Sequence, residues 1–249
     1  MTMLRVEWLR LVRTRRWIAV FAPFLLFGLA SPLLVRYQQQ LVERFATGVQ
    51  ITFPKPTVLA ALQQHEANAA QLGALAVIIV AAMALAIDAD PQRSIFLRTR
   101  ARSLASVVAV RAGVVAAAAV AAWLLGSLGA WYETVVLIGA PDVPGALVGI
   151  GFGALAQLVS VALVVAAIGI VRGTTAAAAI ALITYFTLPL LDLVSALERW
   201  SPVRLQEAFS QLGSGAAHPI DFVRPAISAL ALIAGSFVVG VHGLRRREP

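Results

Sequence analysis

The chain has 249 residues, of which 60% are hydrophobic and only 13% are charged. Soluble domains are roughly 45–50% apolar and about 25% charged, so this composition excludes an ordinary water-soluble fold. The absence of cysteine excludes disulfides, thiolate catalysis and cysteine-based metal sites. A net charge of +8 suggests nucleic acid binding in a soluble protein, but here the placement of the charge matters more, and no nucleic acid partner is expected.

Six apolar runs predict transmembrane helices. A hydrocarbon core of ~30 Å takes about 20 helical residues to cross, and lipid forces each backbone polar group to pair within its own segment. Because six such runs and their connections use up the chain, residues 1–249 are expected to form a single all-α transmembrane domain. The expected spans are 17–35, 69–87, 107–130, 146–171, 174–193 and 225–244.

The segment 1–16 has the pattern of an amphipathic helix that lies in the membrane interface. The simpler alternative is a basic tail that only sets the orientation of the first span, which is too long for a typical signal peptide core. The spacing of Trp8 and its neighbours favours the helix. Its apolar face holds Leu4, Trp8, Leu11 and Val12, and Arg5, Arg13 and Arg16 lie away from that face.

The connection after the second span predicts a short basic helix. Asp90 followed by Pro91 is a good helix start, because a carboxylate caps the first turn and proline suits the first helical position. The alternative is a basic loop whose side chains reach toward the lipid headgroups. The residues expected to present this surface are Asp90, Arg93, Leu97, Arg98, Arg100 and Arg102.

Two further segments stand out along the chain. The fourth span carries Gly145, Gly149, Gly151 and Gly153, which indicates either close helix packing or the general glycine enrichment of membrane helices. The stretch 195–223 is too long for a simple turn. Ser201-Pro202 is a plausible helix start and Gly213-Ser214-Gly215 a plausible stop, so short external helices are expected before the last span.

The arginines set the orientation. Thirteen of the 20 basic residues lie before the first span, between the second and third, between the fourth and fifth, or after the last, and Arg111, just inside the third span, makes fourteen on this side. Both termini are therefore expected in the cytoplasm. The other six basic residues fall on the opposite side, and they are Arg36, Arg44, Lys55, Arg199, Arg204 and Arg224.

The sequence offers no catalytic or cofactor site. A phosphate-binding loop of the G-x-x-x-x-G-K-[ST] type needs a lysine, and the only lysine, Lys55, lies between two prolines in an external loop. No histidine is expected deep within a span, and Ser214 with His218 shares one external loop, which disfavours an intramembrane serine protease. Charges inside the spans are limited to residues near span ends, Arg111 and Asp192, which disfavours an ion-coupled carrier.

The arrangement resembles the permease subunit of type 2 ABC transporters over nearly the whole chain. In that family the loop after the second span has an acidic residue, Gly-Thr, a leucine-rich helix and a Ser-Arg pair. Here Asp88 or Asp90 matches the acidic position, Leu97 with Arg98 the helix, and Arg111 a basic residue entering the third span. The chain departs from the pattern at Arg93-Ser94, which replaces Gly-Thr, and at Arg102-Ser103, which inverts the pair.

The resemblance implies a non-catalytic subunit of an exporter in the plasma (inner) membrane of a bacterium. The basic helix would be a coupling helix seated on a separate ATP-binding subunit, which holds the ATP and magnesium, and this chain would bind no cofactor. A second permease, identical or related, would complete the path across the bilayer. The competing hypotheses are a stand-alone six-span protein (a small carrier, an assembly factor or an immunity protein) and, less favoured, a membrane enzyme.

Overall fold

The computed structural model describes residues 3–45, 53–86 and 103–246. Within these ranges the chain is helical and has no strand, as expected for an all-α protein. Six of the described helices are long and apolar enough to span a membrane, as the sequence predicts. These candidate spans are Arg16–Phe45, Val58–Leu85, Ala105–Leu137, Val143–Ile170, Thr174–Leu193 and Pro219–Arg245.

The helices follow one another with few other residues between them. The first half contains α1 (Met3–Arg13), α2 (Arg16–Phe45), α3 (Val58–Asn68), the π-helical turn η1 (Ala69–Gly73), α4 (Ala74–Leu85) and α6 (Leu104–Leu137). The second half contains α7 (Val143–Ile170), α8 (Thr174–Thr187), η3 (Leu188–Leu193), α9 (Ser195–Glu198), η4 (Pro202–Glu207), α10 (Ala208–Gly213), η5 (Pro219–Phe222) and α11 (Val223–Arg245).

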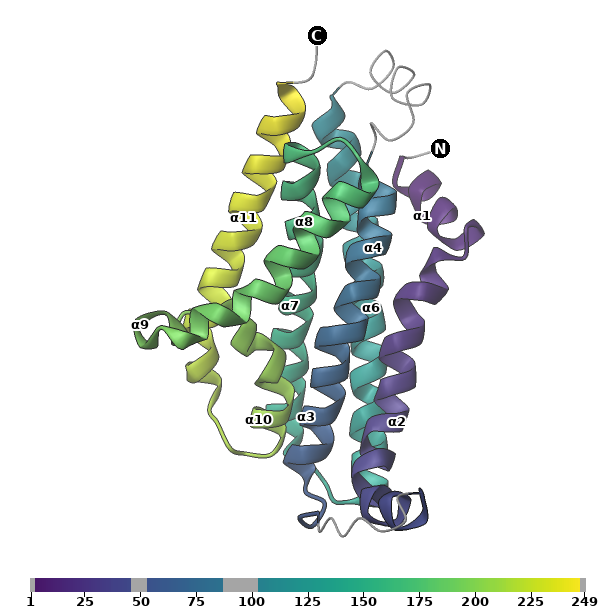
Figure 1. The fold of residues 1–249 in the computed structure, drawn as a ribbon, viewed down its shortest axis with the longest axis vertical. Helices are drawn as coiled ribbons and strands as arrows, with labels where there is room; N and C mark the ends of the chain where they lie inside the picture. The colour runs from purple at the N-terminus through teal and green to yellow at the C-terminus, as the bar shows by residue number, and fades with distance from the viewer. Residues whose placement is uncertain (1–2, 46–52, 87–102, 247–249) are drawn as a thin grey trace.

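Helix α7 lies at the centre of the bundle. It contacts α4, α6, α8, α10 and α11, and 72% of the residues in its most apolar stretch are buried inside the protein. The corresponding fractions are only 17% and 22% for the spans that contain α8 and α11. Because both of these spans are apolar, their outer faces need lipid or another chain as a neighbour. The two ends of the chain lie at the same end of the bundle (Figure 1).

The glycines of α7 permit close packing inside the chain. A Cβ atom at Gly149 would lie 2.5 Å from the carbonyl oxygen of Ala208, and one at Gly153 would lie 2.2 Å from the ring of Trp123. A Cβ at Gly151 would meet nothing within 4 Å. Close helix packing therefore requires glycine at positions 149 and 153. It does not require glycine at position 151, where the general frequency of glycine in membrane helices is a sufficient explanation.

The second candidate span begins at Val58 rather than at residue 69. Thr57 caps α3, since its hydroxyl accepts a hydrogen bond of 3.2 Å from the Ala60 amide. The helix continues through η1, where a π-helical turn widens the backbone. In this turn the Ala70 carbonyl accepts a hydrogen bond of 3.0 Å from the Tyr185 hydroxyl. The turn thus ties the second candidate span to α8.

Short helices connect α8 to α11. Helix η4 begins at Pro202 after Ser201, and α10 ends at Gly213, shortly before Gly215, whose φ of 72° favours glycine. Helix α10 packs against α3 and α7, and Leu205, Phe209 and Leu212 are buried. The part of this connection from η4 to α10 is therefore packed against the bundle, whereas no residue of η3 or α9 is buried.

Candidate functional site

The N-terminal helix α1 folds back on the bundle at a sharp turn. Arg15 has a φ of 56°, which bends the chain sharply between α1 and α2, and the Thr14 hydroxyl donates a hydrogen bond of 2.7 Å to the Arg10 carbonyl at the helix end. Leu11 is buried in the core. Trp8 is 46% exposed and Leu4 is 60% exposed, so part of the expected apolar face points away from the bundle.

An ion pair joins α1 to α6. The Nε atom of Arg111 lies 2.9 Å from Glu7 Oε1, and the two side chains are only 6% and 11% exposed. Arg10 lies on the other oxygen of the same carboxylate, 3.5 Å from Oε2. Removing one partner of such a dehydrated pair leaves a charge that is costly to bury. The pair therefore fixes the position of α1 against the bundle.

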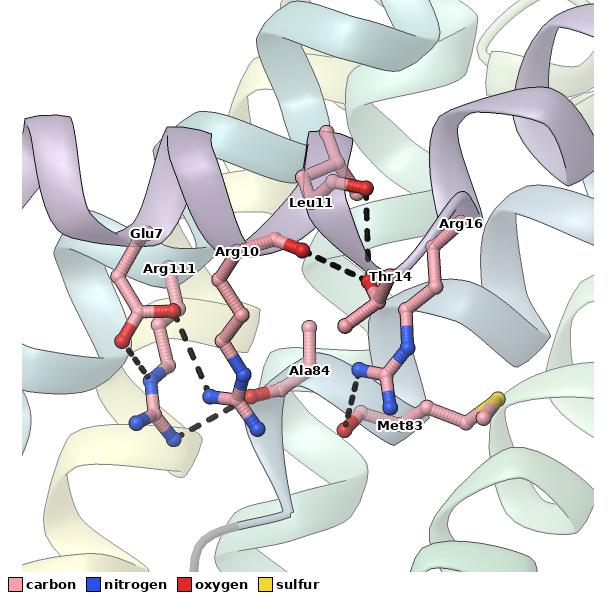
Figure 2. Close-up of polar contacts among 8 residues, drawn as sticks. All are labelled: Glu7, Arg10, Leu11, Thr14, Arg16, Met83, Ala84 and Arg111. Carbon is pink, nitrogen blue, oxygen red and sulfur yellow. Dashed lines mark hydrogen bonds and ion pairs between the residues drawn. The ribbon is translucent and has the colours of Figure 1, made fainter.

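Two arginines also hold the end of α4. Arg111 Nη1 donates to the Ala84 carbonyl over 3.3 Å, and Arg16 Nη1 donates to the Met83 carbonyl over 3.3 Å. The last carbonyls of a helix have no partner within the helix and carry partial negative charge. We call Glu7, Arg10, Arg16 and Arg111 the N-terminal cluster (Figure 2). It links α1, α2, α4 and α6 at one point.

The N-terminal cluster lies beside the last turn of α4, and α4 and α6 are the helices on either side of residues 87–102. Helix α4 ends at Leu85 and α6 begins at Leu104, with Ser103 as its capping residue. Both ends lie at the same end of the molecule as α1 (Figure 1). The residues expected to form the basic helix lie outside the described residues, and they are Asp90, Arg93, Leu97, Arg98, Arg100 and Arg102.

A second polar group lies inside the bundle. His65 and Glu66 on α3 are 0% and 4% exposed, although the sequence prediction placed both before the second span. The His65 ring stacks on Trp123 with 5.4 Å between ring centroids, and its Nε2 lies 3.4 Å from the Ser127 hydroxyl. We call His65, Glu66, Trp123, Ser127 and Phe209 the α10 cluster. The sequence prediction missed it because it began the span at residue 69.

Glu66 holds the start of α10. Its Oε1 accepts hydrogen bonds from the backbone amides of Phe209 and Ser210, over 2.8 and 3.1 Å. These amides belong to the first turn of α10, which has no partner for them within the helix. The carboxylate therefore acts as a cap supplied by a distant helix. The Thr57 capping signal and the uninterrupted helical residues after it would have placed Glu66 in a helix from sequence alone.

The described residues contain no group of three or more His, Cys, Asp or Glu side chains that could hold a metal ion. Ser214 follows the last residue of α10, and His218 is the residue that caps η5. The His218 amide donates a hydrogen bond of 2.9 Å to Asp221 Oδ2. This bond is a local capping contact and assembles no nucleophile and base.

No protein-family model matches this chain, and no curated protein matches it either.

Proposed function

We propose that this chain is the non-catalytic permease subunit of an ATP-driven exporter of the type 2 ABC class. It would work in the plasma (inner) membrane of a bacterium, with both termini in the cytoplasm. Separate ATP-binding subunits would hydrolyse ATP, and a second permease would complete the translocation path. The observation that supports this proposal best is the N-terminal cluster, which joins α1 to the ends of α4 and α6.

The N-terminal cluster suits a docking platform for a cytoplasmic partner. Residues 87–102 connect α4 to α6 and include four arginines, and α1, which contacts α6, exposes Arg5 and Arg13. A partner that contacted both segments would meet one basic surface. A push on either segment would pass through Arg111 to α6 and to the end of α4. Such a linkage is what a permease without its own ATPase requires.

The outer faces of α8 and α11 support a pairing of two permeases. Exposed apolar side chains on these helices include Ile183, Phe186, Leu230 and Val238. Helix α7 is the most buried of the six candidate spans and fills the centre of the bundle. A second copy or a related permease would place a path between two bundles.

A stand-alone carrier is the second candidate, and Glu66 favours it. A carboxylate buried within a candidate span is the kind of group that ion-coupled carriers use. However, two backbone amides of α10 already bind Glu66 Oε1, so a structural role accounts for this side chain. The permease proposal therefore takes precedence.

The test is affinity purification of the tagged chain from its native membrane in mild detergent, followed by an ATPase assay. We expect an ATP-binding subunit to co-purify and to hydrolyse ATP. The variant Arg98→Glu plus Arg100→Glu should lose the co-purifying subunit and the ATPase activity. Reversed charges on residues 87–102 would repel an acidic docking groove on the ATP-binding subunit.

The matched control is Arg36→Glu plus Arg44→Glu, which reverses two charges on α2 beyond the expected span. It should retain the partner and its activity. A pure, partnerless preparation without ATPase activity would contradict the proposal and favour the stand-alone carrier. Equal loss of the ATP-binding subunit from both double variants would contradict a docking site at Arg98 and Arg100.

A further inference from the structure

Three arginines surround a surface hollow at the start of α11. The hollow has a volume of ≈ 480 Å³, and Arg199, Arg204 and Arg224 line it together with Ile220, Asp221 and Val223. Arg199 follows α9, Arg204 lies in η4 and Arg224 in the first turn of α11. Three separate elements thus bring positive charge to one place, which we call the arginine pocket.

The arginine pocket lacks matching negative charge. Its only carboxylate, Asp221, already accepts a hydrogen bond of 2.9 Å from the His218 amide. None of the three arginines lies within 4.0 Å of a carboxylate oxygen in the part of the chain that the structure describes. Arg224 lies over Trp200, with 5.8 Å from its Cζ to the ring centroid. The guanidinium groups are therefore open to an anion.

The position of Arg224 in α11 places the arginine pocket near a membrane surface. Helix α11 has 23 residues, and at 1.5 Å per residue it is ~35 Å long, slightly more than the hydrocarbon core. Arg224 and Arg245 at its two ends then lie near the two headgroup layers. Trp200 beside the pocket is 46% exposed, and tryptophan favours this interfacial layer.

The charge distribution makes these arginines unusual. Six basic residues fall on the side of the membrane that the sequence predicts to be poor in basic residues, and three of the six form the arginine pocket. Apolar side chains border it, and Ile220 is 72% exposed. A ligand that fits carries a phosphate for the arginines and acyl chains for the apolar border, because guanidinium groups bind phosphate through paired hydrogen bonds.

We propose that the arginine pocket binds the phosphate headgroup of an anionic lipid. Arg199, Arg204 and Arg224 would contact the phosphate oxygens, and the acyl chains would lie along the exposed apolar surface of α11. This site is independent of the proposed transport function, because it lies at the opposite end of α11 from the C-terminus.

The test is native mass spectrometry of the protein released from nanodiscs that contain equal amounts of phosphatidylglycerol and phosphatidylcholine. We expect the wild-type chain to retain phosphatidylglycerol and the triple variant Arg199→Gln, Arg204→Gln, Arg224→Gln to retain about tenfold less, equivalent to ~1.4 kcal/mol. The matched control Arg36→Gln, Arg44→Gln, Lys55→Gln removes the other three basic residues of the same predicted side. It should retain lipid as the wild type does.

Two further arms make the result decisive. Glycerol phosphate, added in excess, should fail to displace the retained lipid, and its displacement of the lipid would show a site for free phosphate and overturn the proposal. Equal retention of both lipids by the wild type, or equal retention of phosphatidylglycerol by the two triple variants, would also overturn it. If the glutamine variant elutes as an aggregate in gel filtration, Arg199→Lys, Arg204→Lys, Arg224→Lys replaces it. We expect this lysine variant to retain less phosphatidylglycerol than the wild type, because an ammonium group cannot form the paired hydrogen bonds of a guanidinium group. Retention equal to that of the wild type would overturn the proposal.

Discussion

The N-terminal cluster and the α10 cluster use a glutamate in two different ways. Glu7 pairs with the charged side chain of Arg111 near the surface, whereas Glu66 accepts two backbone amides deep in the bundle. In each case the carboxylate attaches a short helix, α1 or α10, to the long helices. When α1 moves away, Glu7 and Arg111 both become exposed to water, which compensates for part of the lost ion pair, whereas buried amides without an acceptor are expensive. We therefore expect α10 to be a fixed part of the bundle and α1 to be the more easily released element.

The largest effect should come from Glu66. Glu66→Ala leaves the amides of Phe209 and Ser210 buried without an acceptor, and we expect a loss of about 3 kcal/mol in the free energy of unfolding. Glu66→Gln retains an acceptor oxygen and should lose less. Denaturant unfolding in detergent measures both. Equal stability of the alanine variant and the wild type would show that Glu66 does not hold α10.

The next effect tests the packing of α10 on α7. Gly149→Ala places a methyl group 2.5 Å from the Ala208 carbonyl oxygen, which forces the two helices apart and should cost about 2 kcal/mol. Gly151→Ala is the matched control on the same helix, since its methyl group meets nothing within 4 Å. Thermal unfolding of the two variants should separate them clearly. A control as unstable as Gly149→Ala would refute the packing explanation.

A smaller and more local effect is expected at the N-terminal cluster. Glu7→Gln removes the 2.9 Å ion pair between Glu7 and Arg111 and should weaken the attachment of α1 by about 1.5 kcal/mol. A thiol at Leu11→Cys, which is buried in the wild type, should then react faster with a maleimide. The chain has no other cysteine. Arg10→Gln should change the rate little, because its 3.5 Å contact is weaker and more exposed.

The smallest effect concerns the π-helical turn. Tyr185→Phe removes the hydroxyl that donates to the Ala70 carbonyl and accepts from Gln206, and about 1 kcal/mol of stability should be lost. Tyr132→Phe is the control, since Tyr132 is 60% exposed. The measurement is again unfolding in detergent. An unchanged midpoint for Tyr185→Phe would show that the hydrogen bond does not stabilise the turn.

The apolar runs were sufficient to predict the all-α class and six candidate spans, because lipid requires long apolar helices. The second span was the hardest to delimit. Its first part carries polar residues such as Gln63, His65 and Glu66, and hydropathy alone treats these as a connection. They are buried because α10 folds back and supplies partners that are far away in sequence. Local patterns contain no record of such a contact.

The N-terminal cluster was predictable only in part. Arg111 was recognised as a charge near the end of a span, and α1 was expected as an amphipathic helix. The pairing of Arg111 with Glu7 depends on the turn at Arg15, whose positive φ has no sequence signal at an arginine. The glycines of α7 present the same limit, since only the neighbouring backbone distinguishes Gly149 from Gly151.

The most direct test of the central claim is crosslinking from single cysteines in native membranes. The variants Arg5→Cys on α1 and Arg100→Cys in residues 87–102 should both crosslink to the same ATP-binding protein, and Ala216→Cys, between α10 and η5, should not. Crosslinks from both positions to one ATP-binding subunit would establish that α1 and residues 87–102 form a common docking surface. If neither position captures such a subunit while the protein remains folded, the chain is not a permease of this class.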